Sequence, residues 1–175
     1  VFEKELRHRL DSVSIDRLST SSSESDLEAA LERMRKAELV VCGIFARVVT
    51  GTGTVGLPRK LAQWVEKLAQ TDKPVVTIAL GTPYVSHPAM RAYLCTFSNA
   101  DVSQTAAIKA LFGEIPVKGK LPVTLPEVAP LHSGIERERS VMILRDPAPP
   151  ELAPLQSRLQ GGLARPRRRR LARPD

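Results

Sequence analysis

Hydrophobic positions in the first third of the chain switch between helical and strand spacing. Apolar side chains recur every four residues over residues 2–10, which predicts a short amphipathic helix. Ser12–Ile15 then alternates polar and apolar residues, the pattern of a half-buried strand. After a serine-rich loop, Ser25 and Glu28 have the spacing of a capping box, which predicts where a second helix begins. The chain is therefore expected to open with a helix, a short strand and another helix.

Three later segments are apolar without alternation, a pattern typical of parallel strands covered on both faces. These predicted strands are Leu39–Phe45, Val75–Leu80 and Ala92–Thr96. Pro58 and an apolar stripe that includes Trp64 predict a helix after the first of them. Asp101 with Gln104 is expected to cap a last helix, which Gly113 can end. This order predicts an α/β fold, a three-layer α/β/α sandwich with a mostly parallel, doubly wound sheet.

The pattern stops beyond Leu125, where prolines interrupt every possible element except one around residues 141–144. We therefore predict three parts: a sandwich domain over residues 1–126, a proline-rich linker over 127–150, and an irregular, disordered arginine-rich tail over 151–175.

The formal net charge of +7 lies mostly in that tail, which contains seven arginines against two acidic residues. No aromatic residue is interleaved with these arginines to stack on bases, so nucleic acid is not an expected partner. No apolar run is long enough to span a bilayer, and the N-terminus lacks the order of a signal peptide, so no membrane partner is expected. Cys42 and Cys95 lie in apolar runs and are expected to be buried thiols.

The segment Gly51–Gly56 matches the G-x-G-x-x-G pattern of loops that bind dinucleotides. Residues 46–50 separate the preceding strand from the first glycine, so the turn is not tight. The next strand ends in Gly81 and Thr82, where an acidic residue would bind the ribose hydroxyls. Nucleotide binding is therefore the alternative interpretation. The favoured one is a loop at the carboxyl edge of the sheet, where open α/β folds place their ligands.

The turn after the second strand is expected at the same edge, because the strands are predicted to be parallel. It either packs one ring against the sheet or presents the hydroxyls of Thr82 and Tyr84 to a ligand. The candidate binding residues are Arg47, Gly51, Thr52, Gly53, Thr82, Pro83 and Tyr84. No nucleophile elbow, histidine ligand set or pair of carboxylates falls at the strand ends, so no catalytic residue, metal or cofactor is predicted.

Several longer strings carry a family resemblance: Thr50–Pro58, Lys73–Tyr84, Ala92–Ser98, Ala110–Pro116 and Gly119–Val123. In this order they resemble the C-terminal α/β sandwich domain of family 3 glycoside hydrolases, closest to the bacterial β-N-acetylglucosaminidase type. The resemblance covers about residues 1–126. Its most specific part is A-L-F-G-E-I-P followed by G-K-L-P-V.

In that family an N-terminal (β/α)8 barrel supplies the aspartate nucleophile, and in this type also a histidine-based general acid/base. The resemblance therefore implies a non-catalytic accessory domain that meets its carbohydrate substrate through the barrel, its partner. The loops Arg47–Gly53 and Thr82–Tyr84 would pack on the barrel or line the rim of its sugar site. The intact bacterial protein could be extracytoplasmic. The arginine-rich tail departs from the family pattern.

Overall fold

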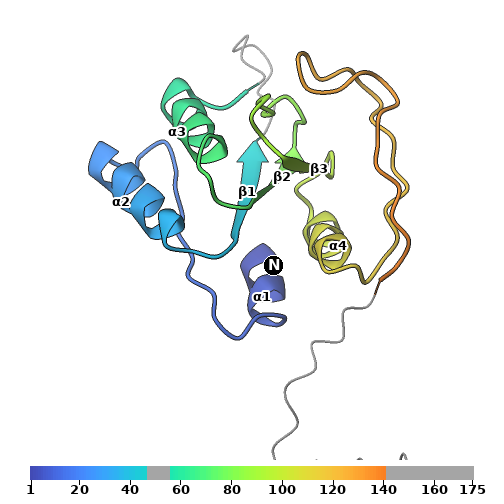
Figure 1. Ribbon diagram of the computed structural model, residues 1–175, viewed down its shortest axis with the longest axis horizontal. Coiled ribbons are helices and arrows are strands. Elements are labelled where there is room, and N and C mark those ends of the chain that lie inside the picture. Colours follow the sequence, from blue (N-terminus) through green and yellow to red (C-terminus); the bar gives the residue numbers. More distant parts are fainter. Residues whose placement is uncertain (47–55, 141–175) are drawn as a thin grey trace, which may run out of the picture. The chain divides into compact units, whose positions relative to one another are not determined.

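The computed structural model describes residues 1–46 and 56–140 (Figure 1). Helices and strands follow one another in the order α1 (Phe2–Arg7), α2 (Glu24–Arg35), β1 (Val40–Ala46), α3 (Arg59–Ala69), β2 (Val75–Gly81), β3 (Ala92–Cys95) and α4 (Asp101–Leu111). The three apolar runs predicted as strands are the three strands of the structure.

The strands form one parallel sheet in the order β1-β2-β3. Val40 pairs with Val75 at the start of the β1–β2 ladder, and Ala46 pairs with Gly81 at its end. Val76 pairs with Ala92 where β3 joins. Because all three strands run in the same direction, the loops that follow them lie at one edge of the sheet, the carboxyl edge.

Helices cover both faces of the sheet, as Figure 1 shows. One face packs on α2 and α3 through buried residues that include Leu31, Ile44 and Leu68. Trp64 belongs to this layer, and its indole N–H donates a hydrogen bond of 2.8 Å to the carbonyl of Leu27. The other face packs on α1 and α4, around the fully buried Ile78. The predicted three-layer α/β sandwich is confirmed.

A glycine lets α1 approach the sheet closely. A Cβ atom on Gly43 would lie 2.9 Å from the ring of Phe2, so a larger residue would require that ring to shift. The Phe2 ring also meets Phe45 edge-on, with 5.8 Å between the ring centroids. The backbone N–H of Phe2 donates to Oε1 of Gln104 at 2.9 Å, which links the start of α1 to α4.

The predicted start of α2 is wrong by two residues. Ser23, not Ser25, is the N-cap: its hydroxyl accepts from the N–H of Asp26 at 3.1 Å. The Asp26 carboxylate in turn accepts from the N–H of Ser23 at 2.8 Å. Both Ser23 and Ser25 begin a serine/acid spacing of three residues, but only the extended backbone of Ser23, with ψ of 165°, allows the reciprocal bonds.

The predicted cap of α4 is also wrong. Ala100 occupies the N-cap position without a side-chain hydrogen bond, and Asp101 is the first helical residue. The amide group of Gln104 donates to the carbonyl of Asn99 at 2.9 Å while its oxygen accepts from Phe2, so it serves the contact with α1.

The expected strand Ser12–Ile15 belongs to no ladder among the described residues. Alternation of polar and apolar side chains shows that an extended segment has one half-buried side. A strand requires in addition a neighbouring backbone with free hydrogen-bonding groups, and the partner of β1 in the structure is β2.

The α1–α4 junction contains the most recognisable string of the sequence. Gly113 ends α4 with a positive φ of +70°, and its N–H donates to Ala110 at 3.1 Å. The next N–H, of Glu114, donates to Lys109 at 2.8 Å, which completes a Schellman motif and confirms that Gly113 ends the helix. The Glu114 carboxylate accepts two hydrogen bonds from Arg9 beyond the end of α1.

Residues 117–140 form an irregular antiparallel ribbon. Val117 pairs with Arg137, Leu125 with Ala129, and the N–H of Ser140 donates to Gly113 at 2.9 Å. Two exposed ion pairs connect the arms: Lys118–Glu138 at 2.9 Å and Lys120–Glu136 at 2.8 Å. Residues 127–140, predicted to belong to a linker, are thus the return arm of this ribbon.

The predicted tail, residues 151–175, and the rest of the predicted linker lie outside the described residues. Within the described ranges, no helix has both the length and the apolar character that a bilayer span requires.

Candidate functional site at the carboxyl edge of the sheet

The turn that follows β2 begins with a glycine that no other residue can replace without strain. Gly81 has a φ of +121°, and a Cβ atom there would lie well under 3.0 Å from the carbonyl oxygen of Ala46. The same carbonyl accepts a hydrogen bond of 3.2 Å from the N–H of Thr82. The end of β1 and the turn after β2 are therefore held in direct backbone contact.

The three residues after Gly81 are arranged differently from one another. Thr82 is buried, and its hydroxyl accepts a hydrogen bond of 3.3 Å from the N–H of Tyr84. The carbonyl of Pro83 accepts from the hydroxyl of Tyr93 at 2.8 Å, and burial raises the pKa of Tyr93 above its usual value. Tyr84 itself is 44% exposed. The structure thus presents the Tyr84 side chain at the surface and holds Thr82 inside the turn.

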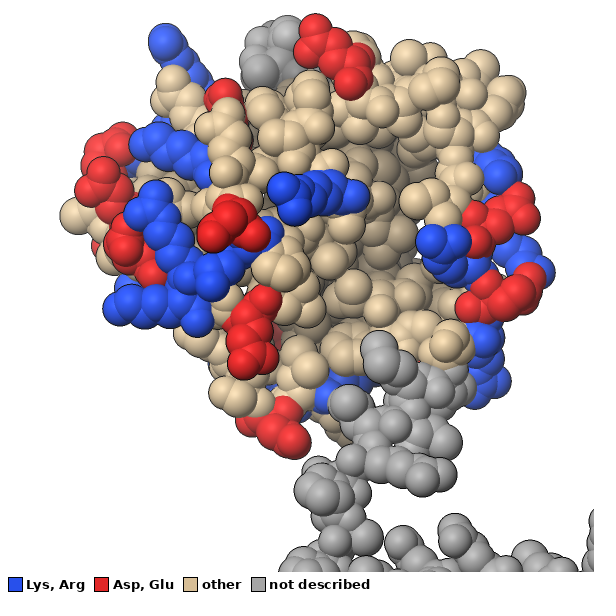
Figure 2. All heavy atoms as spheres, viewed as in Figure 1, with Lys and Arg blue, Asp and Glu red and all other residues tan. Residues whose placement is uncertain are grey.

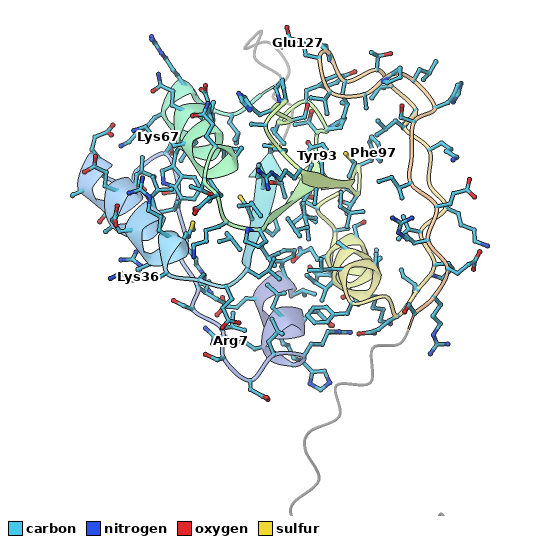
Figure 3. The ribbon with its side chains drawn as sticks, viewed as in Figure 1. Arg7, Lys36, Lys67, Tyr93, Phe97 and Glu127 are labelled. Carbon is cyan, nitrogen blue, oxygen red and sulfur yellow. The ribbon has the colours of Figure 1, made fainter. Side chains whose placement is uncertain are left out.

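A second loop, which the sequence analysis did not select, completes the edge. Phe97 follows β3 with a φ of +56°, a left-handed conformation that is rare for a bulky residue. Thr96 holds this conformation: its N–H donates to Ala79 at 3.0 Å, and its hydroxyl lies 3.2 Å from that carbonyl and 2.6 Å from the carbonyl of Ser98. The Phe97 side chain remains 44% exposed. Figure 3 labels Tyr93 on β3 and Phe97 just beyond it.

These loops border a wide, shallow hollow of about 590 Å³ that is open to solvent. We call it the edge hollow, and it is lined by Ala46, Gly81, Thr82, Pro83, Tyr84, Phe97, Ser98 and Asn99. None of these residues carries a charge. Figure 2 shows charged side chains gathered mainly over α2 and α3 and over the 117–140 ribbon, with a largely uncharged surface between them.

The sequence held a usable signal for the missed loop. In a parallel sheet the residues after every strand share the carboxyl edge, so the segment after β3 belongs beside the turn after β2. The aromatic residue at position 97 was visible in the sequence, but nothing local shows that its side chain is held exposed at the hollow.

Four of the predicted binding residues, Arg47, Gly51, Thr52 and Gly53, lie outside the described residues. The structure therefore brings together only Thr82, Pro83 and Tyr84 of the predicted set. Most of the Gly51–Gly56 motif is likewise outside, so nucleotide binding by this loop stays an untested alternative. Gly56, its last residue, approaches the edge hollow: a Cβ atom there would lie 3.7 Å from the carbonyl of Tyr84.

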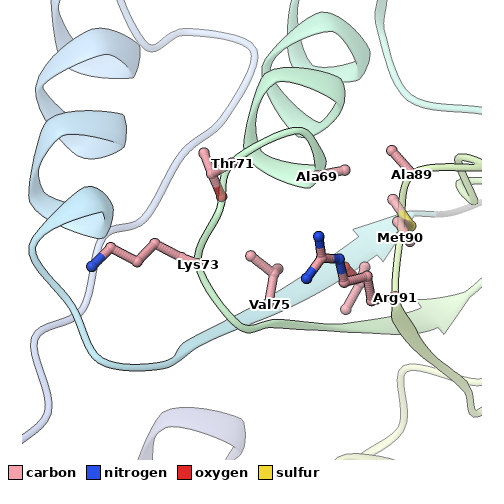
Figure 4. Close-up of a pocket in the computed structure, with 8 residues that line it drawn as sticks. Ala69, Thr71, Lys73, Val75, Ala89, Met90 and Arg91 are labelled. Carbon is pink, nitrogen blue, oxygen red and sulfur yellow. The ribbon is translucent and has the colours of Figure 1, made fainter.

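A second depression lies near the other end of the strands, between the end of α3 and the segment before β3 (Figure 4). Lys73 and Arg91 flank it, but its volume is about 10 Å³. That is room for about one water molecule, so this depression is too small for a ligand.

The two cysteines are free thiols, and burial raises the pKa of Cys42 to about 12 and that of Cys95 to about 11. Such thiols are poor nucleophiles and poor metal ligands at neutral pH. Across residues 1–46 and 56–140, no three His, Cys, Asp or Glu side chains come together as a metal site.

Comparison with known families and structures gives a consistent picture. The model of the glycosyl hydrolase family 3 C-terminal domain matches residues 2–147. Among curated proteins, no match is found. A solved structure from a fungal multi-domain GH3 β-N-acetylglucosaminidase matches 76% of the chain with a TM-score of 0.60 and 19% sequence identity. The match covers 14% of that fungal chain. At this level of identity the likeness shows a shared fold.

Proposed function

The chain belongs to the family of glycosyl hydrolase family 3 C-terminal domains, and from this premise we propose that it is the accessory domain of a β-glycosidase that hydrolyses N-acetylglucosaminides. The observation that carries the proposal is the family match over residues 2–147, which includes the whole described sandwich. The choice of N-acetylglucosaminides is supported by the fungal structure, whose protein is a β-N-acetylglucosaminidase, and by the resemblance of the sequence strings.

In this proposal the catalytic groups come from an N-terminal (β/α)8 barrel. The residues that line the edge hollow include no acid, so this edge would contribute contacts and not acid–base chemistry. Tyr84 is suited to such a role because its side chain is half-exposed on a turn that Gly81 and Thr82 hold rigidly. Arg47 and Gly51–Gly53 stay predicted contacts of the same rim.

The test is a fusion of this chain to the C-terminus of a family 3 barrel whose own C-terminal domain has been removed. Two barrels are used, one from a β-N-acetylglucosaminidase and one from a β-glucosidase. Hydrolysis of the 4-nitrophenyl glycosides of N-acetylglucosamine and glucose is measured for each fusion and for each barrel alone. We expect the chain by itself to be inactive, and the N-acetylglucosaminidase fusion to melt at a higher temperature than its barrel and to differ from it in KM.

Tyr84→Ala in the same fusion should shift KM or the melting temperature further, because the ring lies at the proposed rim. Ile135→Ser is the matched control, since Ile135 is an exposed apolar residue on the ribbon, 69% accessible and outside the hollow. Turnover by the chain alone that survives repurification would contradict the accessory role. So would fusions that match the isolated barrels in both stability and kinetics.

A further inference from the structure

The return arm of the ribbon has an open backbone edge. Val117 and Arg137 exchange both backbone hydrogen bonds, at 2.8 and 2.9 Å. In an antiparallel pair, the residues on either side of such a position direct their N–H and C=O groups away from the partner arm. Among the described residues, the N–H groups of Glu136 and Glu138 have no acceptor, and the carbonyl of Glu136 accepts only from the guanidinium of Arg137, at 3.1 Å. We call this row of backbone groups the outer edge of the ribbon.

Few interactions hold the return arm in place. Every residue from 134 to 140 is exposed, so this part of the arm is not buried in the core. Its two ion pairs with the outgoing arm are exposed as well, and exposed ion pairs contribute little to stability. A two-stranded ribbon is marginally stable by itself. A third strand at the outer edge would add backbone hydrogen bonds, and many proteins bind extended peptides in this way.

The return arm carries charges of alternating sign, and Figure 2 shows acidic and basic side chains gathered on the ribbon. Residues 135–139 read Ile-Glu-Arg-Glu-Arg, and successive side chains of an extended arm point to opposite faces. Both glutamates are paired on their own face with the two lysines of the outgoing arm. Arg137 and Arg139 belong to the other face and form no ion pair with a described residue. The charge of Arg139 helps to lower the pKa of Glu114, but that carboxylate is bonded to Arg9.

This protein does not itself supply a strand that fits these two cations. In an antiparallel pair of two return arms, opposite residues lie on the same face, so arginine would face arginine and glutamate would face glutamate. Residues 141–175 contain eight arginines and three acidic residues, which is the wrong sign of charge. The alternating charges thus disfavour self-association, as charges on edge strands commonly do. An extended segment of another chain, acidic at alternate positions, has the complementary charge.

We propose that the outer edge of the ribbon binds an extended acidic segment of a partner protein as an antiparallel third strand. Backbone hydrogen bonds to Glu136 and Glu138 hold the segment, and its carboxylates lie opposite Arg137 and Arg139, which select the partner and its register. None of these residues lines the edge hollow. The inference therefore does not rest on the proposed glycosidase role.

The experiment measures the binding of three fluorescently labelled peptides to the full chain by anisotropy. The first is Thr-Glu-Val-Glu-Val-Glu-Thr, in which the valines would face Glu136 and Glu138. The second has lysine in place of each glutamate, and the third is the first peptide with both valine nitrogens methylated. We expect a Kd of about 0.1 mM for the acidic peptide and binding roughly tenfold weaker or less for the other two. Methylation keeps the charges and removes the bonding N–H groups, so it separates strand pairing from charge attraction alone.

The double variant Arg137→Glu/Arg139→Glu should reverse the preference, so that the lysine peptide binds more tightly than the acidic one. Arg59→Glu/Arg91→Glu is the matched control, because it changes the net charge equally at two exposed arginines outside the ribbon. Hydrogen exchange followed by NMR gives a second readout. The acidic peptide should slow the exchange of the N–H groups of Glu136 and Glu138. Thermal melts establish that both double variants fold.

The proposal is overturned if the acidic peptide does not bind at about 5 mM. Equal binding of the methylated peptide would overturn it too, because the contact would then be one of charge without strand pairing. Equal loss of binding in the two double variants would show that net charge and not the ribbon is responsible. A wild-type chain whose sedimentation shows a dimer that Arg137→Glu/Arg139→Glu abolishes would assign the outer edge to a second copy, against the proposal. None of these outcomes depends on the barrel fusion.

Discussion

The edge hollow and the α1–α4 junction lie on one small domain but are organised in opposite ways. At the junction, each residue suits the conformation that it adopts. Gly113 has the positive φ that glycine accepts, and the carboxylate of the adjacent Glu114 accepts two hydrogen bonds from Arg9. Arg9 also stacks over the ring of Phe112, 5.9 Å from its centroid. At the edge hollow, a phenylalanine adopts the positive φ and an aromatic ring stays exposed.

This difference shows that the most recognisable string of the sequence and the candidate site lie in different parts of the domain. The junction contains the string A-L-F-G-E-I-P, the most specific family feature of the sequence, and each of its contacts is explained by stability. The edge hollow is made of common residues from the end of β1 and from the two segments that follow β2 and β3, and its geometry includes features that stability alone does not explain. A recognisable motif therefore identified the domain, while the candidate site lies elsewhere.

The largest expected effect concerns the backbone contact that shapes the hollow. Gly81→Ala should lower the free energy of unfolding by about 3 kcal/mol or more, because the Cβ atom collides with the Ala46 carbonyl at a φ that favours glycine. Gly119→Ala is the matched control, since no atom lies within 4 Å of its Cβ position. Urea unfolding measures both. Equal losses in the two variants would contradict a special role for the contact at the edge.

A smaller effect is expected at the junction, where the two hydrogen bonds from Arg9 hold the pKa of Glu114 below its usual value. A lowered folded pKa means that the ion pair stabilises the domain above the unfolded value of about 4.3. This stabilisation is lost as the pH falls through the folded pKa. Glu114→Gln should therefore be less stable than wild type at pH 7, with a difference that shrinks below about pH 4.

Thermal melts of the wild type and of Glu114→Gln between pH 3 and pH 7 measure this difference. Glu138→Gln is the control, because Glu138 pairs with Lys118 at the exposed end of the ribbon, where an ion pair contributes little. If the stability gap between wild type and Glu114→Gln were the same at both ends of the pH range, the ion pair would not be what stabilises the junction.

The smallest expected change in stability is that of Phe97→Gly. Relief of the strained backbone offsets the lost packing and the entropy of glycine, so the free energy of unfolding should stay within about 1 kcal/mol of wild type. An ordinary core phenylalanine truncated to a small residue costs about 3–5 kcal/mol. A loss of that size in urea unfolding would show that Phe97 is a core residue, and the contrast between hollow and junction would disappear.

The sequence predicted the strands correctly where apolar side chains occupy successive positions. The runs at 39–45, 75–80 and 92–96 are strands because apolar residues on successive positions can be buried only from both sides. Gly113 ends α4 because few other residues accept its φ. The capping pair at Ser25 was predicted wrongly because the same spacing begins at Ser23, whose extended backbone allows the bonds. The pair at Asp101 was predicted wrongly because Asp101 is already the first helical residue.

The candidate site was predicted only in part for a related reason. The sequence correctly predicted that Thr82, Pro83 and Tyr84 lie at the carboxyl edge, because these residues follow a strand that was predicted to be parallel. The direction of the strands is enough to decide which loops share an edge of the sheet. The exposure of Phe97 goes with the hydrogen bonds of the preceding Thr96 to the carbonyl of Ala79, seventeen residues away in the chain. No spacing in the sequence encodes those bonds.

The sequence by itself determined the layers of this protein: its periodicity specifies which residues are buried, and its strings specify the family. Only the tertiary structure decided that residues 127–140 return along 117–125, that Gln104 bonds to Phe2, and that Phe97 lines a hollow. The physical reason is the range of the interactions. Hydrophobic burial follows from each residue and its near neighbours, whereas a hydrogen bond or a concave surface depends on which distant segments meet, and that is settled only when the sheet and its helices pack.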